Sequence, residues 1–154
     1  MYSKEAASHL RKEFWTSLGQ YMRPISSAWN PRVNWLNYHT GIKGIFLRMH
    51  ADRSMASIGV EIIYNDAEWR KGVFDAFVPL KMLLHQTLEE EWIWEAEAFD
   101  EHGKALSRIY TVLPHINVMR KEDWPDMIAF FKPRLIAFDA FWADAREHLD
   151  WLNG

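Results

Sequence analysis

The chain has 154 residues, of which 49% are hydrophobic and 25% are charged, the composition of an ordinary globular domain. Its formal net charge is −3, so strong electrostatic attraction to nucleic acid or to an anionic membrane is not expected. Cysteine is absent, which excludes disulfides, thiol chemistry and cysteine-ligated zinc and fits a reducing compartment.

The N-terminal segment MYSKEAASHLRKEFW carries charges where an export signal needs an apolar stretch. No apolar run approaches the ~18 residues that a membrane span requires. We therefore expect a single cytoplasmic domain over residues 1–154 that makes no membrane contact. The 9 Trp, 9 Phe and 5 Tyr exceed what a core needs, which favours an aromatic interface or groove.

The first predicted element is a helix over residues 4–21. Phe14 and Leu18 belong to an apolar stripe with four-residue spacing, which is typical of a helix with one buried face. Ser3 can cap its first turn, and Pro24 should end it.

Residues 35–61 have the longest strand-type periodicity in the chain. Turn residues interrupt it at Thr40-Gly41 and at Asp52-Arg53-Ser54, which predicts a three-stranded antiparallel meander. In its second strand one face carries Ile45, Leu47 and Met49, and the other carries Phe46, Arg48 and His50. In its third strand one face carries Ile58, Val60 and Ile62, and the other carries Ser57, Gly59 and Glu61. Because the apolar sets must face the helices, Arg48, His50 and Glu61 should lie together on the other face.

A second helix is expected over residues 66–88, with a capping box formed by Asn65 and Glu68. Pro79 should kink or split it. Its predicted buried stripe consists of Trp69, Val73, Phe77, Leu80 and Leu84.

A hairpin is predicted next, with strands over residues 92–99 and 104–113 and a loop in which Gly103 supplies a positive φ. On its first strand Trp92 and Trp94 share a face. On its second strand Arg108 and Tyr110 lie opposite Ser107 and Ile109.

The chain closes with a long helical region that Asp123 caps and Pro125 opens. Pro133 is expected to divide it into a short and a longer helix. Its predicted buried stripe is Phe131, Leu135, Phe138, Trp142, Ala145 and Leu149. The order α-β-β-β-α-β-β-α predicts an α+β fold with a five-stranded, mainly antiparallel sheet and helices packed on one face.

One hypothesis for the polar face is a metal-dependent phosphodiesterase site built on Asp52 and Glu61, with His50 beside them. Such a site also needs a lysine two residues after the glutamate. This lysine is missing, because Ile62 and Ile63 follow Glu61. The simpler interpretation, which we favour, is a cross-strand ion pair between Arg48 and Glu61. No metal site, catalytic residue or cofactor is therefore assigned.

The other hypothesis is a binding groove on the same face. Arginine can bind a carboxylate or phosphate through two parallel hydrogen bonds, and aromatic rings stack on planar groups. Its candidate residues are Arg48, His50, Glu61, Trp92, Trp94, Arg108 and Tyr110. The alternative is that the tryptophans belong to the core and the arginines pair with Glu61, Glu95 or Glu97.

Five segments of the chain resemble an uncharacterised bacterial family. They are FWTSLGQYMRPI (14–25), VNWLNYHTGIKGIFLRMHAD (33–52), ASIGVEI (56–62), SRIY (107–110) and EDWPDMIAFFKPRLIAFDAFW (122–142). Members of this family are small, cytoplasmic proteins that carry a domain of unknown function. Related domains occur C-terminal to restriction-endonuclease-like modules, which implies an accessory or recognition role. The family pattern includes Arg48, Glu61, Trp92, Trp94 and Arg108, and it implies no catalytic residue.

Two functions follow. The first is a non-enzymatic binding or interaction domain, with a protein partner or a second copy of the chain, in an accessory role to DNA-associated, restriction- or defence-like systems. Nucleic acid itself is disfavoured as a ligand by the acidic balance. The alternative is a degenerate or unusual metal-dependent phosphodiesterase that uses Asp52 and Glu61.

Overall fold

Four strands form one antiparallel sheet in the computed structural model, which describes residues 3–153. The strands are β1 (Ile45–Ala51), β2 (Met55–Ile62), β3 (Ile93–Phe99) and β4 (Ala105–Pro114), in the spatial order β1-β2-β4-β3. The helices are α1 (Lys4–Met22), α2 (Ala67–Phe77), α3 (Lys81–Leu88) and α4 (Trp124–Leu149). The predicted α+β class is therefore confirmed.

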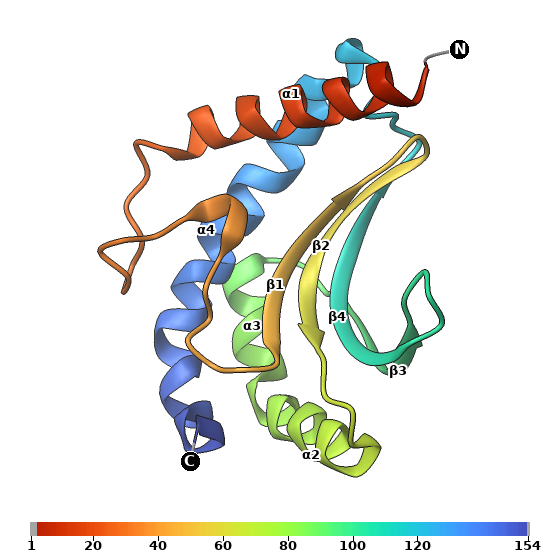
Figure 1. The fold of residues 1–154 in the computed structure, drawn as a ribbon. Helices are drawn as coiled ribbons and strands as arrows, with labels where there is room; N and C mark the ends of the chain where they lie inside the picture. Colours follow the sequence, from red (N-terminus) through yellow and green to blue (C-terminus); the bar gives the residue numbers. More distant parts are fainter. Residues whose placement is uncertain (1–2, 154) are drawn as a thin grey trace.

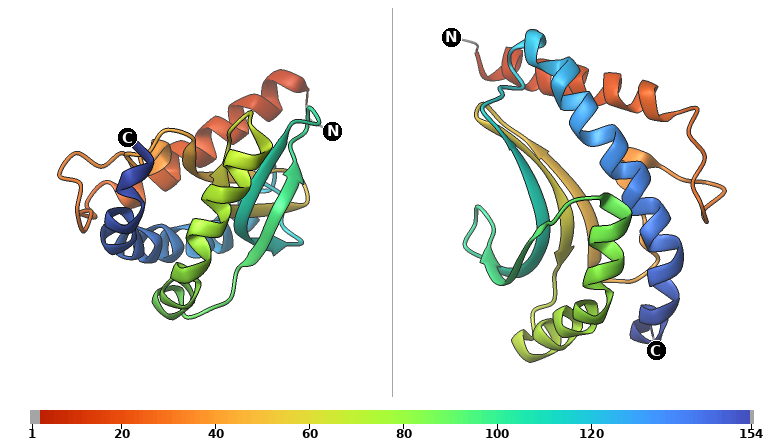
Figure 2. Two further views of the ribbon diagram at one scale, coloured as in Figure 1. Left: turned by 90° about the horizontal axis from the view of Figure 1, so that it is seen from below. Right: turned by 180° about the vertical axis from the view of Figure 1, so that it is seen from behind.

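The strands curve, and the helices lie on the convex side of the sheet. Figure 1 shows α3 and α4 against that side and α1 crossing α4 near one end of the strands. The view from behind in Figure 2 shows α3 and α4 side by side, in agreement with their contacts. The β3–β4 hairpin turns back over the opposite, concave side, and no helix of residues 3–153 covers that face of the sheet (Figure 1).

The prediction of a fifth strand at the start of the meander is wrong. Residues Trp35–Asn37 form a single turn of 3-10 helix, η1, and the chain reaches β1 through turns. The side chain of Asn34 accepts hydrogen bonds from the backbone N–H groups of Leu36 and Asn37. This local cap competes with strand pairing, as asparagine side chains commonly do.

The predicted register of the two other meander strands is confirmed. Arg48 pairs with Gly59, and Gly59 pairs with Tyr110 on β4. Glu61 pairs with Phe46 on one side and with Arg108 on the other. The polar residues of three strands therefore meet on the concave face.

The position of Gly59 at the centre of this face requires a glycine. A Cβ there would overlap the backbone oxygen of Ile109 and the Cα and Cβ atoms of Tyr110. The absence of a side chain lets β2 and β4 approach and leaves space between Arg48 and Tyr110.

The first helix is close to its prediction. The Ser3 side chain accepts a hydrogen bond from the backbone N–H of Ala6, and Phe14 and Leu18 are fully buried. The α1 helix ends at Met22, one residue beyond the predicted end and shortly before Pro24.

The second helical region is split at Pro79, as predicted, by a 3-10 turn over Val78–Leu80. Its N-cap is Asp66, whose carboxylate accepts from the N–H groups of Glu68 and Trp69, so the predicted capping box at Asn65 is wrong. The predicted burial of Trp69 is also wrong, since 46% of that residue is exposed. Its neighbour Arg70 is buried instead and donates to the carbonyl oxygen of Tyr64.

The C-terminal helix α4 is continuous through Pro133, so its predicted division is wrong. Proline in a helix interior costs roughly 3 kcal/mol. Phe131 and Leu135, on either side of it, are both completely buried, and the whole predicted stripe faces the core. Burial of a large side chain contributes roughly 1.5–3 kcal/mol, so the apolar face outweighs the proline.

The cap of α4 also differs from its prediction. Asp123 stands at the N-cap position, and Pro125 lies in the first turn. The Asp123 carboxylate, however, accepts from the backbone N–H of Asn117 rather than from the helix. This hydrogen bond fastens the segment after β4 to the start of α4.

Most of the aromatic content serves the core. Trp142 is fully buried, stacks with Phe77 at a centroid distance of 6.2 Å and donates its indole N–H to the carbonyl oxygen of Thr40. Among the described helices, none has both the length and the apolar character needed to cross a membrane.

Candidate functional site

The site is the concave face of the sheet, where polar side chains from β1, β2 and β4 meet. Arg48 and His50 come from β1, and Glu61 comes from β2. The structure brings all three together, as predicted from their alternation with apolar residues.

Glu61 is the centre of this cluster. Its Oε2 lies 2.7 Å from Nε2 of His50. Its Oε1 forms a longer ion pair with Nη1 of Arg48, at 3.4 Å. Only 7% of the residue is exposed. Burial alone would raise the pKa of the carboxyl, but the hydrogen bond and charge of His50 and the charges of Arg48 and Arg108 outweigh it and hold the pKa below its ordinary value. Glu61 is therefore a buried carboxylate that stays ionised.

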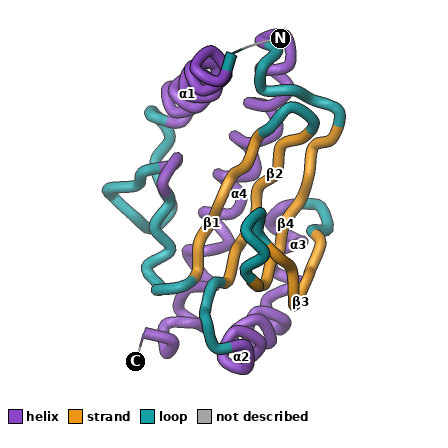
Figure 3. Tube along the Cα trace, turned by 45° about the vertical axis from the view of Figure 1, so that its right-hand side comes forward, coloured by secondary structure: helices purple, strands orange, loops and turns teal. Residues whose placement is uncertain are grey.

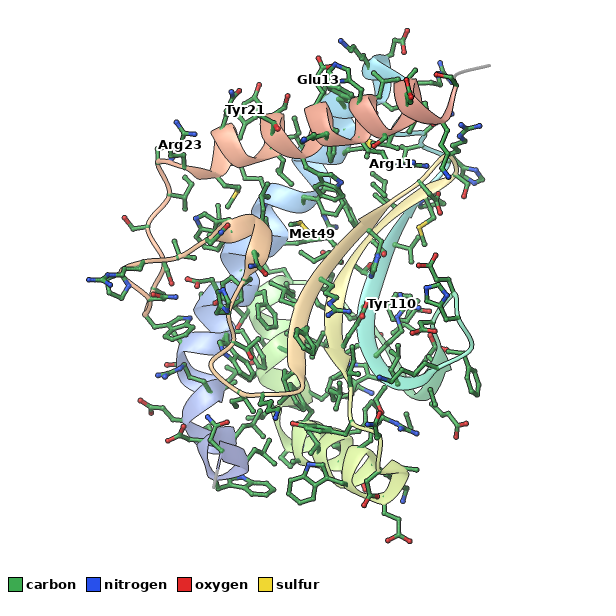
Figure 4. The ribbon with its side chains drawn as sticks, in the orientation of Figure 1. Arg11, Glu13, Tyr21, Arg23, Met49 and Tyr110 are labelled. Carbon is green, nitrogen blue, oxygen red and sulfur yellow. The ribbon has the colours of Figure 1, made fainter. Side chains whose placement is uncertain are left out.

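Arg108 lies on the other side of Glu61, and its guanidinium stacks over the ring of Tyr110 at 4.0 Å from the centroid. Within residues 3–153, no carboxylate lies at ion-pair distance from Arg108. Its neighbour Glu95, together with burial, raises the pKa of the Tyr110 hydroxyl. Figure 4 shows Tyr110 on the open side of β4, toward the β3–β4 hairpin. Arg108 therefore lies between Glu61 and Glu95 in the strand register without a direct ion pair, and its guanidinium remains available to an anion on the concave face.

The β3–β4 hairpin forms the rim of a groove of about 470 Å³ over this cluster. Its loop is fixed by Asp100, which accepts from the N–H groups of His102 and Lys104, and by Gly103 with a φ of 78°. Figure 3 shows the hairpin in front of β2 and β4. The groove is lined by Arg48, His50, Asp52, Met55, Ser57, Glu61, Ile63, Phe99, Asp100, Glu101, His102, Leu106 and Arg108.

Ser57 lies in the floor of the groove between His50 on β1 and Val112 on β4. It is 1% exposed, and its Oγ is buried without a hydrogen-bond partner. A buried hydroxyl without a partner costs roughly 1–3 kcal/mol. Sequence reasoning placed Ser57 on the polar face but did not identify it as a site residue, because alternation gives the face and not the hydrogen-bonding state.

Asp52 lines the groove at the turn between β1 and β2. Its Oδ1 accepts from the backbone N–H groups of Ser54 and Met55 and from the Ser54 hydroxyl. Burial works in the opposite direction, but these bonds keep the pKa of Asp52 below its ordinary value. In the described chain, no three histidine or carboxylate side chains form a group that could hold a metal ion.

The two candidate tryptophans lie on the opposite side of the sheet. Trp92 is buried in the core, and Trp94 packs against Phe74 and donates its indole N–H to Nε2 of His85. The expectation of a tryptophan beside the arginines is therefore wrong. The aromatic rings that the arginines of the concave face stack on are Tyr110, under Arg108, and Phe46, under Arg48.

A second buried carboxylate, Asp139 on α4, was not found from the sequence. It accepts from the hydroxyls of Ser27 and Tyr38 and from the backbone N–H of Ala28. Burial, more than these contacts, raises the pKa of the Tyr38 hydroxyl. Asp139 has its hydrogen bonds satisfied and anchors the loop after α1 to α4, so its role is structural.

A family model described as "Domain of unknown function (DUF4268)" matches residues 10–146. This range includes every residue that lines the groove. Comparison with curated proteins gives no match, and comparison with solved structures gives none. The groove must therefore be interpreted from its own chemistry.

Proposed function

We propose that this chain, which belongs to the DUF4268 family of domains of unknown function, is a non-enzymatic binding domain. Its concave groove takes a small ligand that carries a carboxylate or a phosphate. The anionic group of the ligand pairs with Arg108, and a polar group of the ligand bonds the Ser57 hydroxyl.

The observation that carries this proposal is the unpartnered, buried Oγ of Ser57, a residue that lines the groove. Buried hydroxyls in proteins are nearly always hydrogen-bonded, and exceptions need an explanation. A ligand in the groove supplies the missing partner. Glu61 does not do so in this arrangement, because neither of its oxygens lies within hydrogen-bond reach of the Ser57 hydroxyl.

The size and charge of the groove indicate the class of ligand. Its volume of about 470 Å³ suits a small molecule. Two arginines and four carboxylates line it, so its formal charge is −2 with the histidines neutral. A polyanion such as duplex DNA would be repelled by the acidic rim. A small ligand with a single anionic group can instead reach Arg108 at the floor.

A small anionic ligand is compatible with the accessory role in DNA-associated systems that the resemblance implies. A single nucleotide unit has a phosphate for Arg108 and a base that can stack on an aromatic side chain. The phosphodiesterase alternative has less support, because Oδ1 of Asp52 accepts hydrogen bonds within its own turn and both oxygens of Glu61 contact Arg48 or His50.

A thermal-shift screen tests the proposal with inorganic phosphate, succinate, nucleoside monophosphates and short single-stranded oligonucleotides. A ligand at a hundredfold its Kd stabilises by about 2.7 kcal/mol. We expect a shift with at least one of these anions, and we expect Arg108→Gln to abolish it. The matched control Arg32→Gln removes an exposed arginine outside the groove and should keep the full shift. A shift that persists in Arg108→Gln would refute the assignment, as would no shift with any of the anions.

A further inference from the structure

The outer edge of β1 is a second surface, independent of the groove. In an antiparallel ladder, alternate residues direct their backbone groups toward the neighbouring strand. The bonds from Asp52 N to Met55 O and from Ile63 N to Gly44 O show that even-numbered residues of β1 bond to β2. Leu47 and Met49 therefore direct their N–H and C=O groups away from the sheet.

One end of this edge is closed by the protein itself. Ile45 donates its N–H to the carbonyl oxygen of Ile42 and accepts from the Thr40 hydroxyl. At Leu47 and Met49 no strand of the described residues 3–153 lies beyond β1, because β1 ends the sheet. The edge opens there into a cleft of about 390 Å³, lined by Trp15, Leu36, Asn37, Tyr38 and residues 46–49. Figure 4 shows Met49 in the space between α1 and β1.

The residues that carry these outward groups are partly withdrawn from solvent, since Met49 is half-buried. Leu47 is only 7% exposed, although it lies on an edge strand. Edge strands of monomeric proteins are normally protected by a charge, a bulge or a covering element. Here the flanking α1 and η1 leave a cleft rather than a cover, with unpaired donors and acceptors along one wall.

We propose that this edge binds an extended segment of a partner protein, which adds to the sheet as a strand beside β1. Backbone groups at strand spacing are complementary to another extended chain and to few other ligands. Side chains of the added strand that point to the helix side would meet Trp15, Leu36 and the core face of β1, which favours apolar residues. The intervening side chains would lie beside Phe46 and Arg48, which favours an acidic residue. The partner segment thus alternates apolar and acidic residues.

A second copy of this chain fits the edge less well. A two-fold pairing centred between Leu47 and Met49 would set Arg48 opposite the same arginine of the other copy. Centred on Met49, it would set Arg48 opposite the other copy's His50. Like charges directly opposite each other destabilise a pair of strands, whereas a pairing centred on Leu47 would set Arg48 opposite Phe46 and avoid this contact.

Amide hydrogen exchange, followed by NMR, tests the proposal together with selection from a random heptapeptide display library. We expect the selected heptapeptides to alternate apolar and acidic residues. With the best of them bound, exchange at the Leu47 and Met49 amides should slow by at least about tenfold, because these are the outward-facing donors. The Phe46 and Arg48 amides already bond to β2 and should change little.

The substitution Met49→Pro tests whether the heptapeptide bonds to the outward backbone groups of β1. Proline at this position removes the outward N–H and leaves the ladder to β2 intact. We expect it to weaken heptapeptide binding by more than about tenfold, while Met49→Val stays within about twofold of wild type. The proposal is overturned if no alternating sequence is selected, if the Leu47 and Met49 amides exchange equally fast with the heptapeptide bound, or if they become protected with protein concentration alone. The anion screen uses different residues, so either proposal can fail without the other.

Discussion

At the scale of single residues, Glu61 shows how a buried charge is kept on a sheet face. Its carboxylate is ionised because His50, Arg48 and Arg108 surround it, although burial opposes the charge. A group whose pKa is lowered by folding stabilises the protein above its ordinary pKa, here 4.5, and this stabilisation is lost as the pH falls through the lowered value.

We therefore expect Glu61→Gln to lower the free energy of unfolding at pH 7, by about 1–3 kcal/mol for a hydrogen-bonded charge. The difference from wild type should shrink as the pH falls from 4.5 through the lowered pKa of the folded state, because wild-type Glu61 then becomes protonated and also loses its charge. Urea unfolding at pH 7 and pH 3 measures both differences. An equal difference at the two pH values would show that Glu61 contributes by packing alone.

The polar site could be predicted in part from single residues. Strict alternation placed Arg48, His50, Glu61 and Arg108 on one face, and the register confirms it. The same reasoning could not show which face the tryptophans of β3 would share, because that depends on how β3 pairs with β4. It also could not show that Ser57 lacks a partner, since this depends on the rotamers of its neighbours.

At the scale of elements, the helices and strands follow burial more than local breakers. Pro133 predicts a break in α4, yet the helix continues because the residues on both sides of it are buried. Conversely, the strand-like pattern of residues 35–40 does not form a strand, because Asn34 caps a 3-10 turn and Trp35 and Tyr38 are buried beneath it. Periodicity therefore identified the long elements, and tertiary packing decided the short ones.

Pro133 is exposed, so its replacement tests the cost of the proline without loss of packing. We expect Pro133→Ala to raise the free energy of unfolding by about 1–3 kcal/mol, because it restores a backbone hydrogen bond and removes a clash. Chemical denaturation measures this change. Ile136→Ala, at an exposed position of the same helix, is the control and should change stability by less. A destabilised Pro133→Ala variant would mean that the proline fixes a bend that α4 needs.

At the scale of the whole molecule, the helices cover the convex side of the sheet and leave two surfaces for partners. The concave face holds the groove with Ser57 and Arg108, and the edge of β1 holds the cleft beside Leu47 and Met49. Arg48 lines both, so a ligand in one surface could alter the charge seen from the other.

The central claim is that the groove is built for a ligand at the expense of stability, and Ser57→Ala tests it most directly. The substitution removes a buried hydroxyl that has no partner, so the ligand-free variant should be as stable as wild type or more stable, by up to about 2 kcal/mol. The same variant should lose the thermal shift that the best anion gives to wild type. If Ser57→Ala instead destabilises the free protein and keeps the full shift, the hydroxyl serves the fold, and the groove is not a binding site of the kind proposed.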